Sequence, residues 1–176
     1  AYTLYEDQRY TEALSALERF IELHPAHKDI AYAYYLRALS HYEQISDVGR
    51  DQLATEQAMR ALEQVVRRFP ETAYARDAQL KIDLTRDHLA GKEMDIGRFY
   101  LDSRKYVAAI NRFKTVVREF DTTSHAAEAL HRLTEAYLAI GLTEEARRNA
   151  AVLGHNYPGS RWYQDSYQLL KRAGIS

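Results

Sequence analysis

Seven histidines are the side chains best suited to binding a metal ion in this chain of 176 residues. His24 and His27 lie in a predicted loop, and His125 and His131 are six residues apart. Neither pair therefore shares a helix face at the spacing that metal ligands need. Glu128 lies three residues before His131, but two ligands do not complete a coordination sphere. We predict that the protein has no metal site.

The sequence also lacks the short motifs that accompany enzymatic chemistry. It contains no GxSxG, no GxxxxGK[ST] and no GxGxxG, so neither a serine hydrolase nor a nucleotide-binding enzyme is indicated. It has no cysteine, which excludes disulfides, a thiol nucleophile and cysteine-bound metal. The adjacent carboxylates Glu144 and Glu145 open a predicted helix, where they complement its dipole. We predict that the protein is not an enzyme and binds no cofactor.

Charge and hydropathy argue against two further kinds of partner. The net charge is −1 at pH 7, so no global field attracts nucleic acid or an anionic membrane. No apolar run approaches the roughly 20 residues that a membrane-spanning helix needs, and no signal peptide is recognisable. The first residues lie within a helical pattern that has no N-cap. We therefore expect any targeting or lipid-attachment segment to lie upstream of them.

Fourteen tyrosines are many for this length, and some of them are candidates for binding a peptide. The segment "YAYYLRALSHY" carries two neighbouring helical stripes, namely Tyr35, Leu39 and Tyr42, and Tyr34, Ala38 and His41. A stripe that faces a groove would contact a peptide through apolar area and hydroxyl hydrogen bonds. Tyr35, Leu39 and Tyr42 are our groove candidates. The alternative is that both stripes pack between helices.

The elements that must position these side chains are revealed by helix-ending residues that recur along the chain. The predicted ends are Pro25, Pro70, Asp121 and Pro158. The residue twelve positions before each end is an alanine, namely Ala13, Ala58, Ala109 and Ala146. The residues eight and five positions before each end are apolar: Leu17, Leu62, Phe113 and Ala150, and Phe20, Val65, Val116 and Leu153. This spacing predicts one apolar helix face, with alanine where a neighbouring helix comes closest.

The helix before each of these helices has its own marks. Small residues lie twenty-four positions before three of the ends (Ala1, Gly97 and Thr134), and larger apolar or aromatic residues lie twenty-one before (Leu4, Tyr100 and Tyr137). Such spacing is typical of the tetratricopeptide repeat, a helix–turn–helix unit of about 34 residues. We therefore predict an all-α fold, a tetratricopeptide-repeat solenoid of antiparallel helix hairpins in a right-handed superhelix.

The predicted organisation is a single solenoid over residues 1–176. Its parts are a partial repeat (1–25), a repeat with a loop insertion near 45–52 (29–70), a repeat with a long first helix (73–121), a further repeat (124–158) and a capping helix (160–173). The long helix is predicted over residues 73–103 as a rigid spacer, because Ala78, Ile82, Leu89, Ile96 and Tyr100 keep a helical phase across Gly91. Ser160 is the predicted N-cap of the last helix.

Two of these features, the insertion and the long helix, are absent from ordinary tetratricopeptide adaptors. The segments that carry them, "YAYYLRALSHYEQISDVGRDQ" and "KIDLTRDHLAGKEMDIGRFYLDSRKYVAAINRF", resemble the BamD family, also called YfiO or ComL, along essentially the whole chain. The family consists of lipoproteins of the outer-membrane protein assembly machinery of Gram-negative bacteria. The resemblance implies contact with the membrane only through an N-terminal lipid that these residues do not include.

The resemblance also implies a non-catalytic scaffold of the β-barrel assembly (BAM) complex at the periplasmic face of the outer membrane. Its implied partners are a POTRA domain of BamA, the other BAM lipoproteins and unfolded β-barrel substrates. Arg112 and the adjacent Asn111 match the family segment that docks BamA. Arg112 is also expected to point outward, because Ala109, Phe113 and Val116 take the buried face. The alternative function is a generic periplasmic tetratricopeptide adaptor or peptide-binding protein, and the alternative role of Arg112 is a solvated ion pair within its own helix.

Overall fold

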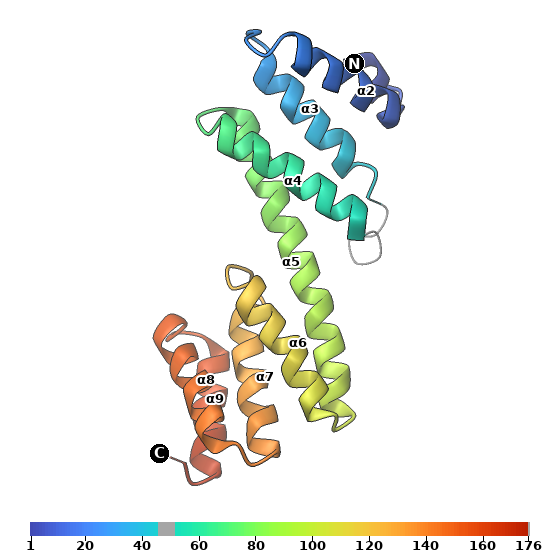
Figure 1. Ribbon diagram of the computed structural model, residues 1–176. Coiled ribbons are helices and arrows are strands. Elements are labelled where there is room, and N and C mark those ends of the chain that lie inside the picture. Colours follow the sequence, from blue (N-terminus) through green and yellow to red (C-terminus); the bar gives the residue numbers. More distant parts are fainter. Residues whose placement is uncertain (46–51, 176) are drawn as a thin grey trace. The chain divides into compact units, whose positions relative to one another are not determined.

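The computed structural model describes residues 1–45 and 52–175. Within these residues the chain forms nine α-helices and no strand, which confirms the all-α prediction (Figure 1). The predicted loop insertion, between the end of one helix at Tyr42 and the start of the next at Gln52, lies largely outside the described residues. The chain divides into two compact units, Ala1–Thr85 (unit 1) and Arg86–Ser176 (unit 2).

Unit 1 contains α1 (Tyr2–Glu6), α2 (Tyr10–Leu23), α3 (Ile30–Tyr42), α4 (Gln52–Arg68) and the first part of α5 (Ala73–Asp102). Successive helices pack as hairpins, α2 against α3 and α3 against α4. One core group joins Leu17 of α2 to Ala33 and Leu36 of α3. A second joins α3, α4 and α5 through residues that include Tyr34, Leu62, Val65, Ala78 and Ile82.

Unit 2 contains the rest of α5, α6 (Tyr106–Glu119), α7 (Ala126–Ala139), α8 (Thr143–Asn156) and α9 (Arg161–Arg172). Helix α6 packs against α7, α7 packs against α8, and α9 contacts both α7 and α8. Its core is one group, which includes Met94, Phe113, Leu133 and Ala146. Ser160 is the N-cap of α9, as predicted, because its Oγ accepts a hydrogen bond of 3.1 Å from the Tyr163 N–H. Helix-hairpin packing of the tetratricopeptide kind is therefore present in both units, while the right-handed superhelix stays a prediction.

The four alanines that define the sequence repeat are all buried. Ala13, Ala109 and Ala146 are 0% exposed and Ala58 is 1% exposed. The apolar positions five residues before the predicted helix ends are also buried in three of the four cases, with Phe20 packed at the margin of its core group. The prediction that these residues form one buried helix face is confirmed.

Helix α5 is continuous through Gly91, as the sequence predicts. The face that it buries differs from the prediction in its second part. Ala78 and Ile82 are buried as expected, but Leu89 and Ile96 are only half-buried, and Ala90 and Met94 take the core positions instead. One helical phase does not describe the whole of α5, because its two parts contribute to different cores.

Gly97 lets α5 approach α6 closely. A Cβ atom built on Gly97 would lie 2.8 Å from Cδ1 of Phe113, nearer than carbon atoms pack without a shift. Phe113 is itself 0% exposed and fills the space beside the glycine. In this repeat, the small residue twenty-four positions before the helix end leaves room for the large one eight positions before it.

One backbone turn recurs where a repeat reverses direction. Gln8, Arg104 and Gly141 have φ of 59°, 59° and 79°, in the left-handed region. In each turn the next residue donates its N–H to a carbonyl five residues earlier: Arg9 to Leu4 (2.8 Å), Lys105 to Tyr100 (2.8 Å) and Leu142 to Tyr137 (2.9 Å). This is the Schellman motif that ends helices. All three left-handed residues lie seventeen positions before a predicted helix end, so the turn keeps the same register as the alanines.

Candidate protein-docking sites

Arg112 lies on α6 beside the buried Phe113, and its side chain is 42% exposed. The neighbouring Asn111 is exposed. On the same helix Ala109, Phe113 and Val116 are buried, so the backbone of α6 turns Asn111 away from the core and leaves Arg112 at its edge. Both docking candidates can therefore be reached from solvent in unit 2.

Arg112 forms an ion pair with Glu93 of α5. Its Nη1 donates to both carboxylate oxygens, at 3.1 Å (Oε2) and 3.3 Å (Oε1). The Glu93 side chain is only 21% exposed. This partner lies on another helix, nineteen residues away in sequence, and not within α6 as the alternative for Arg112 supposed. The pair joins the two helices at the point where Gly97 brings them together.

Further ion pairs join the helices of unit 2. Arg98 of α5 donates to Glu128 of α7 at 2.9 Å, and Arg132 donates to both Glu128 (3.3 Å) and Glu135 (2.7 Å) along α7. Glu128 is 14% exposed. Burial opposes the charged form of Arg98 and Arg132, but the hydrogen bonds that they donate to carboxylates (Asp95 and Glu128 for Arg98, Glu135 and Glu128 for Arg132) raise the pKa of both guanidinium groups. Ion pairs therefore connect α5 to α7 and link successive turns of α7.

Tyr35, in unit 1, is half-buried and firmly held. Its hydroxyl donates a 2.5 Å hydrogen bond to Oδ2 of Asp77, and its ring stacks on Tyr74 at 5.2 Å between centroids. Burial, followed by the bond to Asp77, raises the pKa of Tyr35 well above its ordinary value. The bonds from Tyr35 and then Lys81 lower the pKa of the Asp77 carboxyl. Tyr35 therefore stays a neutral donor at physiological pH.

The two tyrosine stripes of α3 have different surroundings. Tyr34 is 7% exposed, and its hydroxyl accepts a hydrogen bond from Arg68. Leu39 and Tyr42 are half-buried, and Tyr42 packs at the margin of the second core group of unit 1, below the ammonium group of Lys81. The groove-candidate stripe is the less buried of the two, and it keeps part of its surface accessible.

Sequence reasoning missed the aromatic neighbours of these candidates. Tyr74 of α5 contacts the rings of both Tyr35 and Tyr32. Tyr5 of α1 stacks edge-on against Tyr10 and packs beside the first core group. Tyr32 lies three residues before Tyr35, so helical spacing could have grouped these two. Nothing local in the sequence links Tyr74 to them.

The four histidines considered as metal ligands each contact neighbouring side chains. His131 is 6% exposed, with its Nδ1 2.8 Å from Oγ of Ser166. His24 and His27 both pack against the ring of Phe20, and His125 lies against Gly91 with Nε2 3.5 Å from Asp87. Across residues 1–45 and 52–175, no group of three or more potential ligands is arranged to hold a metal ion.

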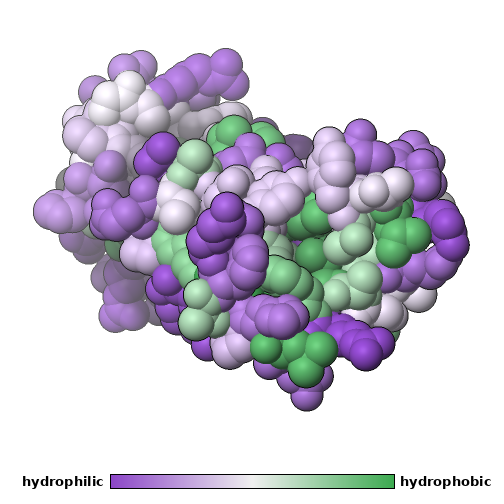
Figure 2. Space-filling model, turned by 90° about the horizontal axis from the view of Figure 1, so that it is seen from above, coloured by the Kyte–Doolittle hydropathy of each residue, from purple (hydrophilic) through white to green (hydrophobic). Residues whose placement is uncertain are grey.

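Large apolar side chains reach the surface of both units. Figure 2 shows one face of the molecule, on which hydrophobic residues lie in several places among hydrophilic ones. The most exposed of these side chains are Leu53 (70%), Val107 (67%), Phe99 (64%) and Leu23 (59%). Singly exposed apolar residues are common on folded proteins, so exposure alone does not mark a docking site.

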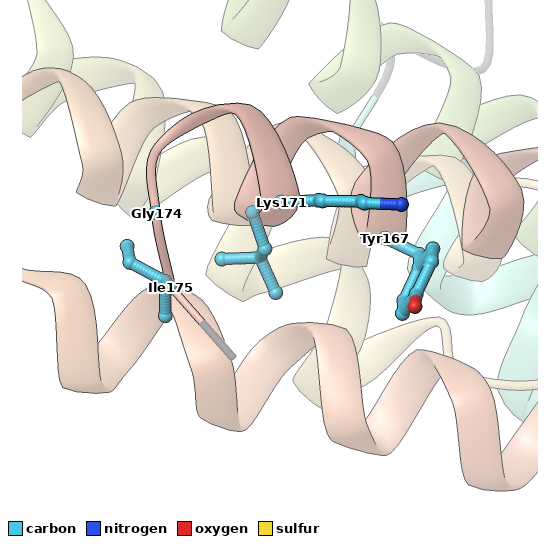
Figure 3. A pocket seen from close by; sticks show the side chains of 5 residues that line it. Tyr167, Lys171, Gly174 and Ile175 are labelled. Atoms are coloured by element: carbon cyan, nitrogen blue, oxygen red, sulfur yellow. The ribbon is translucent and has the colours of Figure 1, made fainter.

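A shallow pocket of about 330 Å³ lies along α9. It is lined by Tyr167, Leu170, Lys171, Gly174 and Ile175. Figure 3 shows Tyr167 and Lys171 projecting from the helix and Ile175 from the segment after Gly174. All of its lining residues come from one helix and its end, so no groups converge on it as a ligand site requires.

Comparison with known proteins settles which kind of helical repeat this is. A family model named YfiO, described as an outer membrane lipoprotein, matches residues 1–153. A relative from Rickettsia prowazekii, named outer membrane protein assembly factor BamD, is 54% identical over 97% of this chain and 68% of its own length. The chain belongs to the BamD (YfiO) family.

Two further BamD proteins support the same family assignment, one at high and one at lower sequence identity. The relative from Caulobacter vibrioides is 56% identical over 99% of this chain, and one from Neisseria meningitidis serogroup A is 33% identical over 96% of it. The chain spans 57% of the length of the Caulobacter relative. The predicted family is confirmed, and all three of these relatives carry the name of an outer membrane protein assembly factor.

The family description associates these proteins with the outer membrane. In the described part of this chain, every helix is too short or too polar to cross a membrane.

Proposed function

We propose that this chain is a non-catalytic scaffold of the machinery that assembles β-barrel proteins in the outer membrane of Gram-negative bacteria. The observation that carries the proposal is the 54–56% identity, over nearly the whole chain, to two outer membrane protein assembly factors named BamD. The family's description as outer membrane lipoproteins supports a position at the periplasmic face of that membrane. The other BAM lipoproteins are further proposed partners.

The proposed docking site for the POTRA domain of BamA is centred on Arg112 and Asn111. Its support is the family segment in which they lie, together with their accessibility at the edge of α6. A guanidinium matches a carboxylate in a bidentate geometry that lysine cannot reproduce. Truncating one partner of such a pair in an interface leaves the other buried and unpaired, which costs about 2 kcal/mol or more.

The test compares Arg112→Ala with Arg118→Ala. Arg118 lies on the same helix, its side chain is 74% exposed, and it pairs with the adjacent Glu119. We expect Arg112→Ala to weaken binding to the periplasmic region of BamA about 30-fold, the equivalent of about 2 kcal/mol, with little change in melting temperature. Arg118→Ala should bind as the parent protein does. Absence of binding by the parent would overturn the proposed function, and unchanged affinity of Arg112→Ala would remove that residue from the site.

Unit 1 is the proposed receiving surface for unfolded β-barrel substrates, through Tyr35, Leu39 and Tyr42. Tyrosine rings offer large rigid contact areas with little side-chain entropy to lose, which suits tolerant recognition of extended segments. Replacing Leu39 and Tyr42 by alanine should weaken binding of a denatured β-barrel protein, measured by crosslinking or fluorescence. The same double variant should bind BamA normally. Equal substrate binding by this variant would contradict the assignment.

The repeats, residues 1–176, are proposed to form one solenoid, in which α5 is an unbroken helix from Ala73 to Asp102. A solenoid suits a scaffold because each repeat contacts its neighbours and leaves a long surface for partners.

A further inference from the structure

Only one nitrogen of the Arg112 guanidinium bonds to Glu93. Both carboxylate oxygens of Glu93 are bonded by the same nitrogen, Nη1 of Arg112. A guanidinium carries five N–H donors in a rigid planar fork. Among the residues that the structure describes, Arg112 has no other hydrogen bond or ion pair. The edge formed by Nε and Nη2 is therefore unoccupied, and it is the edge that takes a carboxylate with two parallel hydrogen bonds.

The position of Glu93 is fixed by the packing of the two helices. Glu93 lies one helical turn before Gly97, where α5 lies close against α6, and Arg112 precedes Phe113, the residue that packs against that glycine. Glu93 is 21% exposed and Arg112 is 42% exposed, so the acid lies deeper than the base. Glu93 thus bonds one end of the guanidinium from the less exposed side, while the Nε–Nη2 edge makes no bond to the described residues.

We propose that Glu93 is a positioning residue, which orients Arg112 so that its Nε–Nη2 edge is presented to a carboxylate of a docking protein. The inference rests on the proposed docking role of Arg112 and adds the second residue of that site. A free arginine side chain has many rotamers, and restricting them before contact lowers the entropy cost of binding. The alternative is that Glu93 competes with the partner's carboxylate. The geometry favours positioning, because Glu93 leaves a complete bidentate edge free.

The experiment is a double-mutant cycle on the full chain. It uses Glu93→Ala, Arg112→Ala and the combined variant, with affinity for the periplasmic region of BamA and melting temperature measured for each. We expect Glu93→Ala to weaken binding about 3- to 10-fold, the range given by ordering one long side chain. In the Arg112→Ala background, removing Glu93 should have no further effect. Glu93→Gln, which keeps one acceptor oxygen for Nη1, should fall between the parent and Glu93→Ala.

The outcomes separate this inference from the function on which it rests. If Arg112→Ala weakens binding but Glu93→Ala leaves it unchanged or tightens it, the positioning role is wrong and the docking role stands. If Glu93→Ala weakens binding equally with and without Arg112, Glu93 acts independently and the inference is overturned. If Arg112→Ala has no effect, both are overturned. Should Glu93→Ala lower the melting temperature markedly, the more conservative Glu93→Gln decides between these results.

Discussion

Units 1 and 2 share a hairpin geometry but differ in the chemistry that lies on it. In unit 1 the half-buried contacts between helices include pairs of aromatic rings, such as Tyr35 and Tyr32 against Tyr74. In unit 2 they include ion pairs, such as Arg112 with Glu93 and Arg98 with Glu128. The difference teaches that the repeat constrains only the small and apolar positions at the helix interface. The remaining positions are free to carry the chemistry that a particular partner needs.

The two chemistries have different physical consequences. Aromatic surfaces interact with many partners through area, and their contacts depend little on salt. Paired charges at partly exposed sites are directional and are screened as ionic strength rises. Binding to unit 1 is therefore expected to tolerate varied sequences and salt, whereas binding to unit 2 should be specific and salt-sensitive.

The largest expected effect comes from a substitution that disturbs the close packing of two successive helices, α5 and α6. Gly97→Ala places a Cβ atom against the ring of the fully buried Phe113. Overpacking of this kind costs about 1–3 kcal/mol, more than the gain of about 1 kcal/mol in helix propensity. Chemical denaturation should show the loss in the free energy of unfolding.

Gly159→Ala is the matched control for this change. A Cβ atom at Gly159 would have no neighbour within 4 Å, and its φ is not positive. Alanine there should be neutral or stabilise by up to about 1 kcal/mol, because it restricts the unfolded chain. Equal effects of the two substitutions would show that the contact between Gly97 and Phe113 is not tight.

The next prediction concerns a buried polar cluster in unit 2. His131 is bonded to Ser166, lies 3.7 Å from Glu135 and contacts the Trp162 ring, with Arg132, Asp165 and Glu128 as further nearby charges. Burial lowers the pKa of His131 below its ordinary value, although Glu135 opposes this. The unfolded chain therefore takes up the proton first. Stability should be fully present above about pH 6.5 and fall as the pH drops below it.

The part of the loss that comes from His131 has an upper limit of about 1.4 kcal/mol per pH unit, because one proton is involved at that residue. Burial also lowers the pKa of His41 in unit 1, and that contribution is the same in the parent and in a His131 variant. Melting temperatures between pH 7.5 and 5 measure the loss. His131→Gln keeps a hydrogen-bonding group for Ser166 but does not titrate, so its melting temperature should depend less on pH. An equally steep dependence in this variant would assign the effect to other groups.

A smaller effect is expected at the aromatic contact of unit 1. Tyr35→Phe removes the hydrogen bond to Asp77 and should cost about 0.5–1.5 kcal/mol, since Asp77 keeps its 2.9 Å ion pair with Lys81. Tyr32→Phe is the control, because the Tyr32 hydroxyl has no hydrogen bond among the described residues. Thermal unfolding of the two variants compares them. Equal stability of both would mean that the Tyr35 bond contributes nothing.

The recurring positions were the most predictable part of the structure, and contacts between distant residues were the least. The alanine positions were predictable because helix contacts demand a small residue at a fixed register, so four copies reinforce one another. The buried face of α5 was mispredicted from Leu89 onward, because one periodicity was extended across a helix that serves two cores. The partner of Arg112 could not be predicted either. Glu93 is nineteen residues away, and only the approach of α5 to α6 at Gly97 brings the two side chains into contact.

The smallest expected effect concerns the turn that both units share. Gln8 in unit 1 and Arg104 in unit 2 adopt the left-handed conformation that Gly141 adopts in the same turn. The left-handed conformation costs a residue with a Cβ atom about 1–2 kcal/mol. Replacement by glycine removes this strain, but glycine loses more conformational entropy on folding, so the net gain in stability is smaller. Arg104→Gly and Gln8→Gly should therefore each stabilise by a few tenths to about 1 kcal/mol, and Gly141→Ala should destabilise by about 1 kcal/mol. Denaturant titration of the three variants measures these differences, and a loss of stability in Arg104→Gly would show that the arginine side chain contributes more than the strain of its backbone.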